Sequence, residues 1–65
     1  MLSMRRKFRI GQSVNYRPAV GRNALGRYQV IRFLPPRKDG EPQYQIKHLD
    51  EGQERIAGES ELRSA

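Results

Sequence analysis

The sequence predicts a small all-β domain, a barrel or a sandwich, with about five short antiparallel strands. Three observations support this. Apolar and polar residues alternate with a period of two in several segments, as in strands with one solvated face. Turn residues separate these segments at spacings of roughly ten residues. Two of the segments flank a charged turn in the manner of a β-hairpin.

The predicted hairpin is the clearest unit. Its first strand, residues 28–34, is rich in aromatic and β-branched side chains, which suit a half-buried pleated surface. Its second strand, residues 43–49, places Tyr44 and Ile46 on one face and polar residues on the other. The segment between them contains an Asp-Gly step, which favours a turn, and prolines, which cannot donate to a β-ladder.

Shorter strands are predicted on either side of the hairpin. Residues 13–17 form the first strand, which Pro18 ends because proline lacks the backbone donor. Residues 53–57 form another strand with Ile56 as its strong apolar anchor. Residues 59–63 form either one helical turn or a last short edge strand.

The apolar alternation slips within residues 28–34, where both faces of the strand carry apolar side chains. Such a strand either bends around a barrel or contains a bulge that switches its faces. Phe33 or Ile31 then joins the core from the far side of the bend. The rest of the predicted core consists of Val14, Tyr16, Tyr28, Val30, Leu34, Tyr44, Ile46, Ile56 and Leu62.

Length and composition limit the class of protein. A chain of 65 residues forms one domain with a thin core, since a domain of this size buries only about 60% of its unfolded surface. It has no cysteine for disulfides or thiolate metal sites. No apolar run approaches the roughly 20 residues of a membrane span, and no apolar segment of a secretory signal follows the basic start. We expect a cytoplasmic protein with no membrane partner, starting at Met1 or Met4.

Charge is distributed unevenly along the chain, whose net charge is +6. The part before Asp39 has ten Lys and Arg residues and no acid, whereas the rest has three bases and all seven acids. A basic half of this kind indicates an anionic partner. The alternative is that the two halves fold against each other and neutralise part of the charge.

Residues for catalysis or metal binding are scarce. His48 is the single histidine, so neither a metal cluster nor a nucleophile–base pair is supported. We predict that His48 is a partly buried, hydrogen-bonded residue at a strand end, and that Ser60 is a capping or turn residue. The acidic pair Asp50–Glu51 is expected in a solvated turn. The protein is therefore predicted not to be an enzyme and to use no metal and no cofactor.

Several short motifs follow one another in a familiar order. They are Phe8-x-Ile10-Gly11-Gln12-x-Val14, Gly26-x-Tyr28-x-Val30, Leu34-Pro35, Gly40-Glu41, Tyr44-x-Ile46-Lys47 and Glu54-Arg55-Ile56-Ala57-x-Glu59-Ser60-x-Leu62. This order resembles small, uncharacterised alphaproteobacterial proteins that are expected to be SH3-like barrels. The resemblance implies a bacterial protein with one SH3-like β-barrel over residues 8–63, and no particular activity. More loosely, the closing segment is similar to Tudor-like and KOW-like barrels, which include RNA-, ribosome- and methylated-peptide-binding modules.

Our leading hypothesis is a small, basic, non-catalytic module that binds nucleic acid, RNA or the ribosome ahead of DNA. A flexible basic tail, residues 1–7, and arginines around the first strands would contact phosphates. The predicted binding residues are Arg5, Arg6, Lys7, Arg17, Arg22, Arg27 and Arg32. Two alternatives stay open. One is a protein-interaction module of SH3 or Tudor type that takes a peptide or an acidic protein in a groove or at an edge, and the other is a small subunit of a larger complex.

Overall fold

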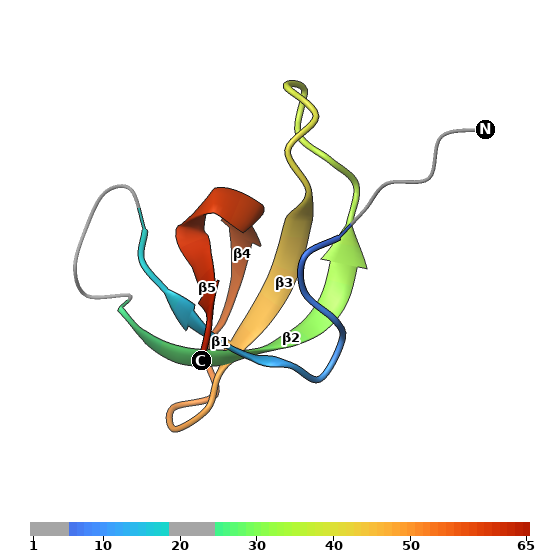
Figure 1. Ribbon diagram of the computed structural model, residues 1–65. Coiled ribbons are helices and arrows are strands. Elements are labelled where there is room, and N and C mark those ends of the chain that lie inside the picture. Colours follow the sequence, from blue (N-terminus) through green and yellow to red (C-terminus); the bar gives the residue numbers. More distant parts are fainter. Residues whose placement is uncertain (1–5, 19–24) are drawn as a thin grey trace.

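A computed structural model describes residues 6–18 and 25–65 of the chain. Five strands form one antiparallel sheet (Figure 1). They are β1 (Ser13–Tyr16), β2 (Gly26–Leu34), β3 (Gln43–His48), β4 (Glu54–Gly58) and β5 (Leu62–Ser64), and one turn of 3-10 helix, η1 (Glu59–Glu61), joins β4 to β5. The predicted all-β class with about five short antiparallel strands is confirmed.

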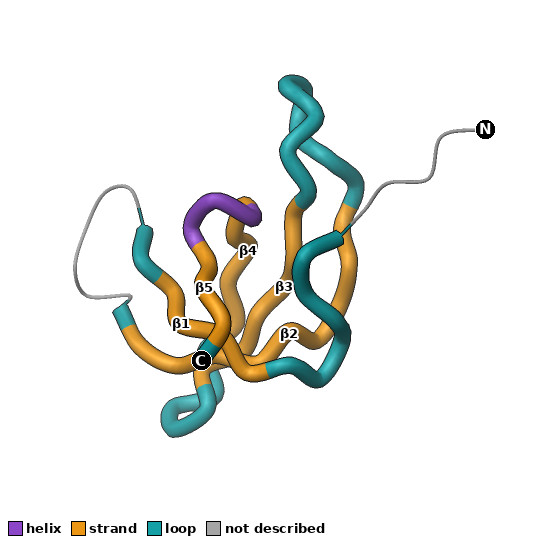
Figure 2. The backbone as a smooth tube through the Cα atoms, in the orientation of Figure 1, coloured by secondary structure: helices purple, strands orange, loops and turns teal. Residues whose placement is uncertain are grey.

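The strand order in the sheet is β4-β3-β2-β1-β5, so β1 lies between β2 and β5. The two outermost strands are consecutive in the chain. Because only three residues of η1 join them, the ends that they share lie close together, and the sheet must curl. The backbone trace shows this curl (Figure 2). One face of the sheet, which we call the inner face, therefore encloses the core, and the other, the outer face, points to solvent.

Strand positions agree with the sequence pattern to within two residues. The first strand ends at Tyr16, one residue before the predicted end. The hairpin strands begin at Gly26 and end at His48, and the fourth strand is shifted by one residue to Glu54–Gly58. Both alternatives for the closing segment occur, because the helical turn η1 is followed by the short strand β5.

The predicted bulge in β2 is confirmed. Val30 pairs with Ile46, but the next pairs along the ladder are Arg32 with Gln45 and Phe33 with Tyr44. The β2 strand thus has one residue more than β3 in this interval, which transfers the inner-facing positions from even to odd numbers. Phe33 packs edge-on against Tyr44 with ring centroids 5.9 Å apart, although its side chain stays half-exposed.

The core lies against the inner face and is built largely from rings. Its nine buried residues are Phe8, Val14, Tyr16, Tyr28, Val30, Tyr44, Ile46, Ala57 and Leu62. The rings meet edge to face: Phe8 contacts Tyr44 at 5.6 Å between centroids, and Tyr16 contacts Tyr28 at 5.3 Å. Edge-to-face pairs of this kind add to the stabilisation that burial itself provides.

The core prediction is wrong for two residues, Ile56 and Leu34. Ile56 is 62% exposed because the β3–β4 register pairs it with Gln45, on the outer face. Its neighbour Ala57 pairs with Tyr44 and is fully buried instead. Leu34 is only partly buried, since it ends β2 one position beyond the inner-facing Phe33. The sequence prediction also missed Phe8.

The hydroxyl of Tyr44 connects three parts of the chain. Tyr44 is fully buried on β3, and its Oη accepts hydrogen bonds from the backbone N–H groups of Lys7 (3.1 Å) and Phe8 (3.4 Å). The same hydroxyl donates to Glu59 Oε2 of η1 at 2.5 Å. Burial, with a smaller effect of the hydrogen bond to Glu59, raises the pKa of Tyr44. The hydroxyl therefore stays protonated and ties the N-terminal segment and η1 to the sheet.

Arg6 and Lys7 pack against this domain, although we predicted that they belong to a flexible tail. The Arg6 guanidinium donates to the carbonyl oxygens of Leu34 (2.7 Å) and Gln43 (2.9 Å), which lie on the two strands of the hairpin. It also lies over the Phe33 ring, with Cζ 4.6 Å from the centroid. The described part of the domain thus begins before residue 8, and residues 1–5 lie outside the described residues.

Replacing Tyr44 with phenylalanine tests the role of its hydroxyl. Tyr44→Phe keeps the ring but removes the acceptor of the Phe8 N–H and one of the two partners of the Lys7 N–H and of Glu59, so we expect a loss of about 1–3 kcal/mol in unfolding free energy. Urea denaturation measures this loss. The matched control is Tyr16→Phe, because the Tyr16 hydroxyl makes no hydrogen bond within the described residues, and it should cost clearly less. Equal losses in the two variants would contradict this role.

Candidate functional site

A row of polar and basic side chains crosses three adjacent strands on the outer face. Asn15 of β1 pairs with Arg27 of β2 on one side and with Arg63 of β5 on the other. Directly paired residues of an antiparallel sheet project from the same face. The neighbours of these residues along each strand, Tyr16, Tyr28 and Leu62, are buried, so the row points outward. We call Arg27, Asn15 and Arg63 the basic row.

The basic row opens onto a shallow groove of about 330 Å³. Arg17 lies beside it, two residues after Asn15, and its backbone N–H donates to the carbonyl oxygen of Glu61 at 2.9 Å, which extends the β1–β5 ladder. The described residues that line the groove are Asn15, Tyr16, Arg17, Leu25, Gly26, Arg27 and Arg63. Three of them carry a guanidinium and none of them is acidic, so the groove presents concentrated positive charge.

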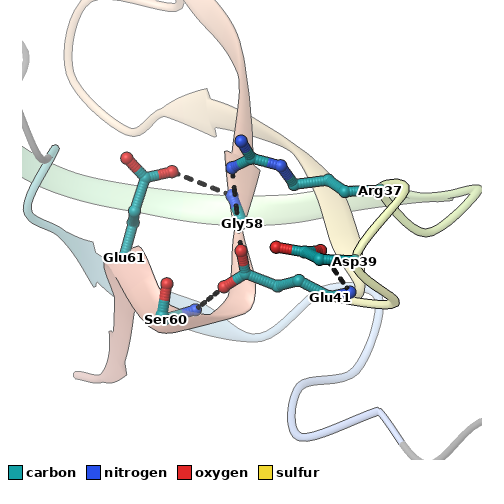
Figure 3. Close-up of polar contacts among 6 residues, drawn as sticks. All are labelled: Arg37, Asp39, Glu41, Gly58, Ser60 and Glu61. Atoms are coloured by element: carbon teal, nitrogen blue, oxygen red, sulfur yellow. Dashed lines mark hydrogen bonds and ion pairs between the residues drawn. The ribbon is translucent and has the colours of Figure 1, made fainter.

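Acidic side chains gather elsewhere, around η1, and satisfy backbone groups there (Figure 3). Glu41 reaches from the β2–β3 hairpin to η1, where its Oε2 accepts a hydrogen bond of 2.7 Å from the Ser60 N–H. Glu61 Oε1 accepts from the Gly58 N–H at 2.9 Å, at the start of η1. Glu59 Oε2 accepts from Lys7 N–H at 2.8 Å as well as from Tyr44. These carboxylates are used to hold the fold together.

The carboxylate of Glu41 fits closely at this junction. The hydrogen bonds from Ser60 lower the pKa of Glu41, and the nearby Arg37 guanidinium contributes less. A Cβ atom on Gly58 would lie 2.8 Å from Glu41 Oε1, so glycine at this position leaves room for the carboxylate. The hairpin and the closing segment are therefore joined through a charged acceptor on backbone donors, which is among the stronger kinds of hydrogen bond.

Little of the basic charge is neutralised by ion pairs. Between residues that the structure describes, one ion pair forms, from Arg37 Nη1 to Glu41 Oε1 at 3.7 Å. The side chains of Arg17, Arg27 and Arg63 are exposed and have no ion pair or hydrogen bond within residues 6–18 and 25–65. The exposed guanidiniums of the groove are thus available to an external anion.

The predicted binding residues separate into different places. Arg17 and Arg27 meet at the groove. Arg32 also lies on the outer face of β2, paired with Gln45, but five residues further along the strand, roughly 16 Å from Arg27. Arg6 is committed to the hairpin carbonyls, as described above. Lys7 lines a second groove, of about 350 Å³, which Arg63 also borders. Arg5 and Arg22 lie outside the described residues.

Arg63 belongs to the site although the sequence prediction missed it. It follows the acidic segment of the chain and stands near the C-terminus, so local composition groups it with the acids. Its place in the row depends on the pairing of β5 with β1, which joins residues almost 50 positions apart. In the sequence, only Leu62 indicated this pairing, because it was predicted to return to the core. Leu62 is indeed buried.

His48 is a structural residue at the end of β3, as predicted. Its Nδ1 accepts hydrogen bonds from the backbone N–H groups of Asp50 (3.1 Å) and Glu51 (3.0 Å) and thereby organises the turn before β4. Its ring packs edge-on against Tyr28 at 4.9 Å. A Cβ atom on Gly26 would lie 2.8 Å from its Nε2, and Gly26 has a φ of +152°, so glycine is favoured there for two reasons.

Within the described residues, no group of three or more His, Cys, Asp or Glu side chains is arranged to hold a metal ion. The same part of the chain contains no helix long and apolar enough to cross a membrane.

Comparison of the chain with family models, curated proteins and solved structures found no match. The resemblance to SH3-like, Tudor-like or KOW-like barrels therefore stays a prediction.

Acid should weaken the junction that Glu41 forms. Because the folded state lowers the pKa of Glu41, its carboxylate stabilises the fold above the unfolded pKa, and this stabilisation is lost as the pH falls through the folded pKa. We expect Glu41→Gln to be less stable than the wild type near pH 7, with a difference that shrinks toward about pH 3. Urea denaturation across this pH range measures the difference.

Glu51→Gln is the control for this experiment, because the exposed Glu51 side chain accepts no hydrogen bond within the described residues. Its stability should follow that of the wild type across the range. A Glu41→Gln variant with a constant stability deficit at all pH values would contradict the role of the Glu41 charge.

Proposed function

We propose that this protein is a non-catalytic module that binds nucleic acid, RNA ahead of DNA, through the basic row and its groove. One observation carries the proposal. Arg17, which follows β1, lines one groove with Arg27 of β2 and Arg63 of β5, without an intramolecular anionic partner in the described residues, while the carboxylates of Glu41, Glu59 and Glu61 are used by backbone or hydroxyl donors.

Phosphate is the anion that this arrangement suits best. A guanidinium has five donors in a planar fork and binds phosphate oxygens through two parallel hydrogen bonds. Several arginines on one face bind a repeating phosphate chain better than a single carboxylate, because each contact releases a condensed counterion from the nucleic acid. The net charge of +6 adds long-range attraction for the same partner.

A peptide-binding role finds less support in the described surface. Peptide-binding barrels use grooves lined with exposed aromatic rings. Phe8, Tyr16, Tyr28 and Tyr44 are buried here, and the half-exposed ring of Phe33 is covered on one face by the Arg6 guanidinium. Lys7 and Arg63 border the second groove, which Glu59 also lines.

The test is a titration of the protein with a fluorescently labelled, mixed-sequence RNA at salt concentrations from about 50 to about 200 mM. We expect binding at low salt that weakens steeply with added salt. Replacing Arg17, Arg27 and Arg63 together with glutamine should reduce the slope of log K against log salt by about 0.7–0.9 for each phosphate that the variant no longer binds.

Arg32→Gln is the matched control, since Arg32 is an exposed arginine on the outer face of β2 that lies outside the basic row. It should change the affinity much less than Arg27→Gln. Absence of binding at low salt, or an unchanged salt slope in the triple variant, would contradict the proposed function. Pull-down of a protein partner would then be the next experiment.

A further inference from the structure

We propose that the basic row is built for double-stranded RNA and spans its minor groove, with the two arginines on phosphates and Asn15 on a ribose 2′-hydroxyl. This inference rests on the proposed function and specifies the class of nucleic acid. It combines the absence of exposed rings beside the row, the spacing of the row and the free amide at its centre.

The described groove of the basic row lacks a surface for base stacking. Proteins that bind single strands combine a basic groove with aromatic rings on which successive bases stack. Beside the groove, Tyr16 is only 8% exposed and Tyr28 is fully buried. Phe33 lies on the inner-facing side of β2 with Tyr44, away from the row. The described groove thus offers bases no exposed ring, so the contacts it can make are to phosphate and sugar.

The two arginines of the basic row are held at a fixed spacing. Adjacent strands of a sheet are about 4.8 Å apart, so Arg27 on β2 and Arg63 on β5 start about 10 Å from each other, on opposite sides of Asn15. The hydrogen-bonded ladder fixes this spacing. The minor groove of an RNA duplex is wide and shallow and is bordered by phosphates. The minor groove of B-form DNA is only about 6 Å wide, which suits a row of this span less well, whereas its major groove, about 12 Å wide, has room for the row but presents no 2′-hydroxyl.

The centre of the basic row carries an amide side chain. The Asn15 side chain is exposed, lines the groove and makes no hydrogen bond within the described residues. An amide supplies both a donor and an acceptor. The ribose 2′-hydroxyl is also both, it is exposed in the RNA minor groove, and DNA lacks it. An unpartnered amide between two arginines therefore matches a sugar hydroxyl between two phosphates.

The experiment compares three labelled probes of one sequence: an RNA duplex of about 16 base pairs, the corresponding DNA duplex and the single-stranded RNA. We expect the RNA duplex to bind most tightly. Asn15→Ala should weaken binding to the RNA duplex by about fivefold, the effect of removing one hydrogen bond, and should leave binding to the DNA duplex unchanged. The salt slope should stay the same, since the variant keeps the arginines that bind the phosphates.

Ser13→Ala is the matched control, because Ser13 lies on the same strand and the same face but two pairs away from the row, opposite Gln29. It should leave all three affinities unchanged, and urea denaturation of both variants verifies that they fold. Binding of the single strand as tightly as the duplex would overturn this inference and leave the proposed function intact. So would an Asn15→Ala variant that loses the same affinity for RNA and DNA duplexes. Failure of all three probes to bind would overturn the proposed function itself.

Discussion

The fold depends on the buried hydroxyl of Tyr44. A chain of 65 residues without cysteine has only a thin apolar core to hold its ends in place. Tyr44 lies on the inner face of β3, where its ring packs against Phe8 and Phe33. Its hydroxyl binds two N–H groups of the N-terminal segment and the carboxylate of Glu59. One side chain thus supplies apolar contact and long-range polar contact together, and joins segments that no disulfide connects.

This polar junction also decides how charge is arranged on the surface. Glu59 is used by Tyr44 and by the Lys7 N–H, and Glu41 and Glu61 accept hydrogen bonds from Ser60 and Gly58 around η1. Three of the seven acids are thereby gathered around η1, where β4 turns into β5. The basic row lies on the outer face of β2, β1 and β5, with no acidic side chain among the described residues of its groove. The three carboxylates around η1 therefore do not line the groove of the basic row.

The local features of this fold could be predicted from the sequence, whereas the features that depend on strand register could not. Alternation over Gln43–His48 identified the buried Tyr44 and Ile46, and the slip in β2 identified the bulge. Ile56 was wrongly predicted to be in the core because it is the most hydrophobic residue of its strand. The strand register decides otherwise, since it pairs Ala57 with the buried Tyr44 and thereby turns Ile56 to the outer face. Arg63 was missed for the same reason, since its position in the site comes from a pairing between distant strands. Arg6 looked like part of a basic tail because its acceptors are backbone carbonyls, which composition does not reveal.

The basic row includes a residue of β5, which is the shortest strand of the sheet. The β5 strand has three residues, lies at an edge and pairs only with β1, so it has few hydrogen bonds to hold it. Arg63 is on β5, whereas Arg27 is on β2, on the other side of β1. On the proposed function, a nucleic acid that contacts both arginines also holds β5 against β1. Since such a ligand binds the folded chain in preference to the unfolded one, it adds to the stability of a small domain in proportion to the logarithm of its concentration above Kd.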